Sequence, residues 1–345
     1  MLRRIRGRGV FLAALAGACL LAACSTTSAN TGEQHSIDVG AGDPVSVSGS
    51  PRIAVFLAGA NNTLGQVTVD ESKKVGAEQH IDVTVFDARY DSQVQYDQIQ
   101  SAITSGRYNA FVVVAMDPNG VCDLVSKDAP AGGVVTVTEA VPLCGRAFGP
   151  PDQLYQPGTL SFVSGQSDSA NFVRWAGEIR KRNPGPQKAL FVTGPEILPS
   201  SVNSSKPFQA FAAQDPSFKV IVSHGDYTQQ SGQDQTANLL TANPDATLIV
   251  TDYTDLTKGA VQALKDAGRT GVKVYDYGGG QDAVQLIKSG DVELTAAILP
   301  ASWIRTSIGQ IVNAFAGKPV DRIVPLGANE PFITRDNVST FKPEY

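Results

Sequence analysis

The chain has 345 residues, of which 42% are hydrophobic and 18% charged, and its formal charge is −5. At about 150 residues per domain this length predicts two domains, and the apolar fraction excludes a disordered chain. The acidic balance argues against a nucleic-acid-binding protein, which would present a basic surface. Four cysteines are too few for a scaffold built on disulfides.

The first residues have the build of a secretory signal. A basic start is followed by an apolar stretch over 10–23, shorter than the about 20 residues that span a bilayer. Its end, Leu21-Ala22-Ala23-Cys24, resembles the lipobox of bacterial lipoproteins. We expect residues 1–23 to be removed and Cys24 to carry lipid, which anchors the protein to the outside of the cell membrane. An ordinary signal peptide is the alternative.

The segment 24–50 is rich in Ser, Thr and Gly. This composition predicts a flexible tether between the anchor and the folded part.

Two cysteines, Cys122 and Cys144, remain after such processing. Disulfides persist outside the cytoplasm, so we expect the two to be bonded, with separate buried thiols as the alternative. A metal site is not expected because there is no C-x-x-C spacing and no histidine nearby. No other cofactor is expected.

From residue 52 onward, short β-rich runs alternate with helical patterns, and a Pro/Gly-rich patch around residue 150 separates two halves. This order predicts an α/β fold of two doubly wound parallel sheets, each covered by helices on both faces. The expected strands are 53–57, 81–86, 111–114, 133–137, 189–192, 218–222, 246–250, 272–275 and 293–298. The expected helical segments are 64–79, 93–105, 172–182, 207–213 and a helix that ends over 236–242.

Three stretches carry a family resemblance. Ala60-Asn61-Asn62 follows the opening strand, 238–245 reads Asn-Leu-Leu-Thr-Ala-Asn-Pro-Asp before an apolar strand, and 258–264 reads Lys-Gly-Ala-Val-Gln-Ala-Leu. In these features the chain resembles the type I periplasmic sugar-binding proteins, the receptors of ABC importers, from about residue 52 to residue 338.

The resemblance implies two lobes joined by three hinge crossings, near Ser164, Leu299 and Gly327. Ligand would bind between the lobes at the carboxyl ends of the strands, and the lobes would close around it by a hinge motion. The implied boundaries are 51–164 plus 299–327 for the N-terminal lobe and 165–298 plus 328–345 for the C-terminal lobe.

Several candidate ligand-binding residues come from the first half. Asn62 matches the ligand asparagine of the family and Asn61 precedes it; an amide both donates and accepts, as a hydroxyl does. Asp117 matches an acceptor of sugar hydroxyls, with a helix N-cap as the alternative. Glu139 follows the fourth strand and could supply a polar contact.

The other candidates lie further along the chain. Tyr227 falls where relatives carry a ligand aromatic, and Asp252 matches a polar ligand position. Asp276 and Tyr277 end the next strand, where the alignment is ambiguous by one residue. Trp303 follows a crossing and could wall the cleft, with packing in the core as the alternative.

Two departures from the family bear on the ligand. Leu64 and Gly65 stand where close relatives carry stacking aromatics, and neither of the arginines that relatives carry is present. Both departures disfavour a stacked pyranose, and we favour a linear polyol.

Catalytic signatures are missing from the sequence, which contains no G-x-S-x-G, P-loop or H-E-x-x-H motif. We therefore expect a non-enzymatic, monomeric receptor that binds a neutral sugar or sugar alcohol and serves an ABC permease, with no nucleic-acid partner. The alternatives are a receptor for a nucleoside or another small ligand, and a ligand-binding protein coupled to a membrane sensor.

Overall fold

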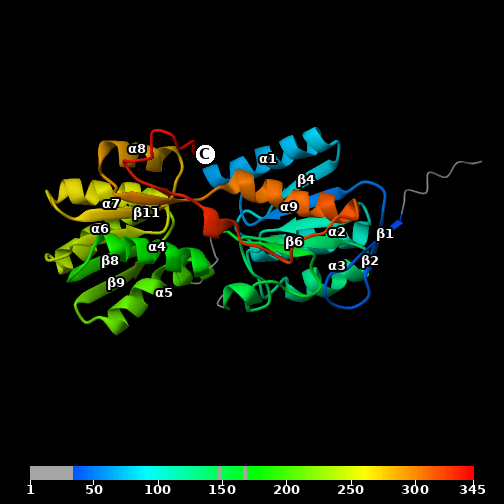
Figure 1. The fold of residues 1–345 in the computed structure, drawn as a ribbon, viewed down its shortest axis with the longest axis horizontal. Helices are drawn as coiled ribbons and strands as arrows, with labels where there is room; N and C mark the ends of the chain where they lie inside the picture. Colours follow the sequence, from blue (N-terminus) through cyan, green and yellow to red (C-terminus); the bar gives the residue numbers. More distant parts are fainter. Residues whose placement is uncertain (1–33, 147–148, 166–168, 197) are drawn as a thin grey trace, which may run out of the picture.

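The computed structural model describes residues 34–345 except 147–148, 166–168 and 197. The described residues form two six-stranded sheets, one in each of two lobes that lie side by side (Figure 1). The predicted α/β fold with two parallel-sheet lobes is confirmed.

The N-terminal lobe has the strand order β13-β7-β6-β5-β3-β4, and every pair is parallel. Its strands are β3 (Arg52–Leu57), β4 (Asp82–Asp87), β5 (Ala110–Val113), β6 (Val135–Glu139), β7 (Ser161–Val163) and β13 (Ile323–Val324). Its helices are α1 (Thr63–Gln79), α2 (Ser92–Ser105), the π-helix η1 (Leu124–Asp128), α3 (Ala129–Ala131), the 3₁₀ turn η3 (Pro151–Gln153) and α9 (Pro300–Phe315).

The central strand β3 shows why the apolar runs predicted strands. Successive side chains of a strand point to opposite faces of the sheet. Ile53 and Val55 pack with α9, whereas Ala54 and Phe56 pack with α2 on the other face. A strand covered on both faces must be apolar throughout.

The C-terminal lobe has the order β14-β12-β11-β10-β8-β9, parallel except that β14 runs antiparallel at the edge. Its strands are β8 (Gln187–Thr193), β9 (Phe218–His224), β10 (Leu248–Thr251), β11 (Lys273–Gly278), β12 (Leu294–Ala297) and β14 (Phe332–Ile333). Its helices are α4 (Ser169–Arg182), α5 (Pro199–Gln214), α6 (Gln229–Ala242), α7 (Thr254–Asp266) and α8 (Gln281–Ser289).

The chain passes between the lobes three times, from β7 to α4, from β12 to α9 and from β13 to β14. The last passage includes the 3₁₀ turn η4 (Leu326–Asn329), which packs against α4.

Helix α5 is longer than the sequence predicted. The pattern indicated a helix only over 207–213, but α5 begins at Pro199, which occupies its first turn. The first half of α5 is rich in serine and has no apolar period. Ser201, Ser204 and Ser205 are nevertheless buried, so polar side chains fill the places that the pattern expects to be apolar.

A hairpin before β3 corrects the predicted tether. Residues 34–48 form an antiparallel pair, β1 (Gln34–Ile37) and β2 (Val45–Ser48), at the end of the N-terminal lobe away from the other lobe (Figure 1). Ile37, Val39, Val45 and Val47 are buried in the core of that lobe. The tether prediction is therefore wrong over 34–48, because the abundance of Ser and Gly hid the alternation of these four residues.

The predicted cleavage site and lipidated Cys24 lie outside the described residues. Within the part of the chain that the structure describes, no helix combines the length and the apolar character needed to cross a membrane.

The structure joins Cys122 and Cys144 in a disulfide, with their Cα atoms 5.1 Å apart. The bond links the turn after β5 to the loop after β6.

Candidate functional site

A cavity of about 640 Å³ lies between the two lobes. Its volume falls within the range of about 300–1,000 Å³ typical of small-molecule sites. The N-terminal lobe contributes the ends of β3, β5 and β6 and the start of α1; the C-terminal lobe contributes the start of α5 and the loops after β9 and β10. The cavity thus lies at the carboxyl ends of parallel strands, where open α/β sheets bind ligands.

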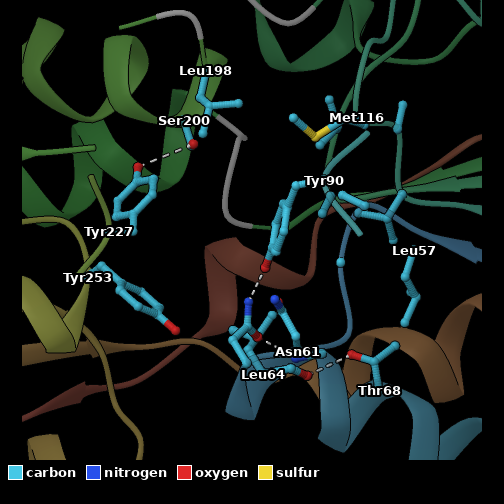
Figure 2. Close-up of a pocket in the computed structure, with 18 of the residues that line it drawn as sticks. Leu57, Asn61, Leu64, Thr68, Tyr90, Met116, Leu198, Ser200, Tyr227 and Tyr253 are labelled. Atoms are coloured by element: carbon cyan, nitrogen blue, oxygen red, sulfur yellow. Dashed lines mark hydrogen bonds between the residues drawn. The ribbon is translucent and has the colours of Figure 1, made fainter. Parts of the chain in front are cut away.

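Aromatic side chains form much of the wall. Tyr227 and Tyr253 pack edge to face with ring centroids 5.5 Å apart, and they face Tyr90 across the cavity (Figure 2). Trp303 is buried, lines the cavity and donates its Nε1–H to Glu330 Oε1 at 2.8 Å. The indole of Trp303 therefore both lines the cavity and packs in the core, as the two interpretations from the sequence separately suggested.

The two asparagines predicted from the sequence both line the cavity. Asn62 caps α1, since its Oδ1 accepts the Gly65 N–H at 2.8 Å, and its Nδ2 donates to the Tyr90 hydroxyl. A Cβ at Gly65 would lie 2.5 Å from the Gly59 carbonyl oxygen. The close approach of α1 to this backbone therefore excludes a larger side chain at Gly65.

Glu139 ends β6 and lines the cavity with only 2% of its surface exposed. Ser307 donates its hydroxyl to Oε2 at 2.6 Å, the only hydrogen bond to this carboxyl among the described residues. Burial raises the pKa of Glu139 to about 7, and the bond from Ser307 opposes this in part.

Tyr227 lines the cavity and lies in front of a buried acid. Its hydroxyl lies 2.9 Å from Ser201 Oγ and donates to Asp252 Oδ2 at 3.2 Å. Asp252 Oδ2 also accepts from the hydroxyls of Thr193 (2.6 Å) and Ser204 (2.7 Å). Burial raises the pKa of Asp252 to about 6, and burial together with the Asp252 charge raises the pKa of Tyr227. Asp252 is not among the lining residues of the cavity. It accepts the hydrogen bond of the Tyr227 hydroxyl and so fixes the position of that ring.

Residues 53–319 match the family described as the periplasmic binding protein domain. The chain belongs to this family. The resemblance inferred from the sequence is thereby confirmed, and the family is one of substrate-binding proteins.

Several known proteins are similar to this chain over most of their length. The xylitol-binding protein of Mycolicibacterium smegmatis is 26% identical over 307 residues, covering 87% of this chain and 81% of that protein. A solute-binding protein of Actinobacillus succinogenes solved with bound D-allose superposes with a TM-score of 0.73 at 17% identity, covering 85% of this chain and 100% of that one. The myo-inositol-binding protein of Caulobacter gives 0.71 at 22% identity, covering 84% and 96%.

Two predicted ligand residues on β11 do not line the cavity of this binding protein. Asp276 is fully buried and accepts from the hydroxyls of Thr257, Thr295 (2.5 Å) and Thr254 (3.2 Å). Burial raises its pKa to about 6. Tyr277 points to the opposite face of the sheet and packs 5.3 Å, centroid to centroid, from Trp175. Alternation along a strand therefore directs both side chains into the C-terminal core.

Asp117 also lies outside the cavity lining. It is exposed, and its Oδ1 accepts the N–H groups of Asn119 and Gly120, each at 3.0 Å. Asp117 therefore caps a turn, which is neither the ligand contact nor the helix N-cap expected from the sequence. Met116, directly before it, lines the cavity instead.

Two tyrosines of the cavity lining, Tyr90 and Tyr253, were not among the candidates taken from the sequence. Tyr90 closes the turn after β4, with Arg89 and Tyr90 at φ of 52° and 60°, and a Cβ at Gly59 would lie 2.3 Å from the Tyr90 ring. Position after a strand end was the available signal for both tyrosines.

Proposed function

We propose that this protein binds a sugar or sugar alcohol reversibly in the cavity between its lobes and delivers it to an ABC permease in the membrane. The observation that carries the proposal is the composition of the cavity, in which directional polar groups from both lobes surround a volume walled by aromatic rings. The relatives named for xylitol and solved with D-allose or myo-inositol support the same ligand class.

Hydroxyl-rich ligands need many directional bonds because they bury little apolar surface. The amides of Asn61 and Asn62 donate and accept, and so do the hydroxyls of Tyr253 and Ser200. The rings of Tyr90 and Trp303 can cover the C–H faces of a carbon chain or ring. We expect the ligand to be held in this way and to leave unchanged.

Groups from both lobes must contact the ligand at once. Ligand binding would therefore stabilise the arrangement in which the lobes are closed, and the three crossings would act as the hinge.

We also propose that lipid on Cys24 anchors the protein outside the cell membrane. The hairpin strand β1 begins at Gln34, so 34 − 24 = 10 positions separate the anchor from the folded lobe. At about 3.5 Å per residue the link reaches at most about 35 Å. Cys24→Ala should release the protein from the membrane fraction, and unchanged retention of the variant would contradict anchoring.

A nucleoside is the second candidate ligand, and the aromatic wall favours it. Tyr90, Tyr227, Tyr253 and Trp303 all line the cavity, and a heterocycle could stack on such rings.

Calorimetric titration of the purified protein with pentoses, hexoses, linear polyols, cyclitols and nucleosides separates the two candidates. We expect saturable binding of one or more sugars or polyols, with the bound compound recovered unchanged by mass spectrometry. Binding confined to nucleosides, or chemical conversion of any sugar, would contradict the proposal.

A further inference from the structure

The cavity between the lobes is acidic. The described residues that line it include three carboxylates and no lysine, arginine or histidine, and the carboxylates are Glu139, Asp226 and Asp255. Carboxylates can accept hydrogen bonds from neutral hydroxyls, but no positively charged side chain among the described lining residues balances these three.

The three carboxylates are not equivalent. Asp255 lies 3.2 Å from Lys258 Nζ and already has a counter-charge. Asp226 is exposed at the rim and forms no ion pair within the described chain. Glu139 is buried, and among the described residues its one hydrogen bond comes from the neutral Ser307. A buried carboxylate without a cation is costly, so Glu139 lacks a positive partner that a ligand could supply.

Aromatic rings surround the same space. Trp303 precedes Ser307 by four residues on α9, so one face of this helix brings the indole and the Glu139 carboxyl to the cavity together. Tyr227 and Tyr253 approach from the C-terminal lobe, and Tyr90 lies opposite them (Figure 2). The faces of such rings attract ammonium groups.

We propose that the ligand carries a protonated amine beside its hydroxyls, as an amino sugar, an amino polyol or an aminocyclitol does. The ammonium group pairs with Glu139 against the ring of Trp303, and the hydroxyls bind the amides and tyrosines. This inference rests on the proposed function, uses the same cavity and replaces the expectation of a neutral ligand.

The chemistry of the amine accounts for the features that a neutral polyol leaves unexplained. An ammonium group offers three donors and a full positive charge, and a charge-assisted hydrogen bond is about twice as strong as a neutral one. Asp226 at the rim adds attraction for an approaching cation. No arginine, which would repel a cation, occurs among the described lining residues.

Matched ligand series test the inference. Calorimetry compares each neutral parent with its amino-deoxy and N-acetylamino derivatives: glucose with glucosamine and N-acetylglucosamine, glucitol with 1-amino-1-deoxyglucitol, and myo-inositol with an amino-deoxyinositol. In at least one series the amine should bind about tenfold or more tightly than the parent. N-acetylation, which removes the charge, should abolish the advantage.

The pH dependence gives a second readout in the unmodified protein. The ionised Glu139 is the form that pairs with an amine, so affinity for 1-amino-1-deoxyglucitol, whose alkylammonium group stays protonated in this interval, should rise as pH increases from about 6 to about 8. Affinity for the neutral parent should stay nearly flat. Among the described lining residues, the other titratable groups are Asp226, Asp255 and the three tyrosines, and Glu330 lies behind Trp303.

The variant Glu139→Gln keeps the shape of the side chain and removes its charge. It should bring the amine-to-parent affinity ratio close to one. Asp234→Asn, which removes the same charge from α6 outside the cavity lining, should keep the ratio of the unmodified protein. Should Glu139→Gln fail to fold, Asp226→Asn at the exposed rim should lower the ratio by about two- to threefold.

The outcomes separate this inference from the proposed function. If every amine binds no more tightly than its neutral parent, the inference of an amine-bearing ligand is wrong, and the protein remains a receptor for a sugar or polyol. Failure of all sugars and polyols, charged or neutral, to bind overturns both.

Discussion

At the scale of single residues, Glu330 holds the wall of the cavity in place. Its Oε1 accepts from Trp303 at 2.8 Å, its Oε2 lies 3.5 Å from the Tyr277 hydroxyl, and Arg174 donates to its backbone carbonyl at 2.6 Å. Glu330 follows η4 on the third crossing, whereas Trp303 follows the second. One carboxyl therefore links the second and third crossings next to the cavity wall formed by Trp303.

Removing that acceptor should loosen the indole. In Glu330→Ala the buried Nε1–H of Trp303 loses its partner, which costs about 1–3 kcal/mol. We expect a lower melting temperature, ligand binding weakened by several fold and a red-shifted tryptophan emission. A Trp175→Phe background isolates the signal, because the chain contains two tryptophans. Glu330→Gln retains an acceptor and should largely restore the emission; identical spectra in all three proteins would contradict this role.

Buried acids also predict how stability depends on pH. Burial raises the pKa of Glu139 and of Glu330 to about 7, and of Asp252 and Asp276 to about 6. Each group binds protons more tightly in the folded than in the unfolded chain. The stability it contributes is complete below its unfolded pKa and is lost as pH rises through the folded value.

The ligand-free protein should therefore melt at a lower temperature at about pH 7.5 than at about pH 5.5. In Glu139→Gln the fall across this interval should be smaller, because one of the groups that titrates there is gone. Melting curves across the interval provide the test. A melting temperature that rises steadily from the lower pH to the higher would contradict the proposal that burial raises the pKa of these acids.

Strand alternation explains which residues could be predicted as ligand contacts. Asn62, Glu139 and Tyr227 follow or end strands and line the cavity, as position suggested. Asp276 and Tyr277 also lie at a strand end, but adjacent side chains on β11 enter opposite cores. A single sequence does not define the end of a strand to within one residue. A shift of one residue moves a side chain from the cavity into the core, or the reverse.

At the scale of elements, the apolar runs predicted the longer strands of both sheets, since a strand covered on both faces must be apolar throughout. The short strands β7, β13 and β14, of two or three residues each, were not predicted. The β1–β2 hairpin was missed because its buried residues alternate with exposed ones in a segment rich in Ser and Gly. The first half of α5 was missed because serines fill its buried face. In both cases many small polar residues masked the spacing of buried residues from which a strand or a helix is predicted.

The hairpin offers its own test of the corrected tether. Val47 is buried in the N-terminal core, whereas Ser46, its neighbour on β2, is exposed. Val47→Ala should lower the free energy of unfolding by about 1–3 kcal/mol, measured by urea denaturation. Ser46→Ala, on the opposite face of the same strand, should leave it almost unchanged. Equal effects of the two substitutions on the free energy of unfolding would instead support the prediction of a flexible tether.

At the scale of the whole molecule, the two lobes meet around a cavity that neither could form alone. The N-terminal lobe supplies the asparagines, Glu139 and Trp303, and the C-terminal lobe supplies Tyr227 and Tyr253. Because the groups that would hold the ligand are divided in this way, capture and release depend on how the lobes move about the crossings. We therefore expect the ligand to bind in this cavity.

Blocking the cavity tests that claim most directly. Ser200 lines it at the start of α5, and Ser200→Trp would place an indole in the space that the ligand occupies. Gln214→Trp adds the same side chain at the exposed end of the same helix.

The measurement is calorimetric titration of all three proteins with the sugar or polyol that binds best to the unmodified chain. We predict that Gln214→Trp binds as the unmodified protein does and that Ser200→Trp loses affinity by at least about tenfold, since filling the site excludes the ligand. Undiminished binding to Ser200→Trp would show that the ligand binds elsewhere and would contradict the account.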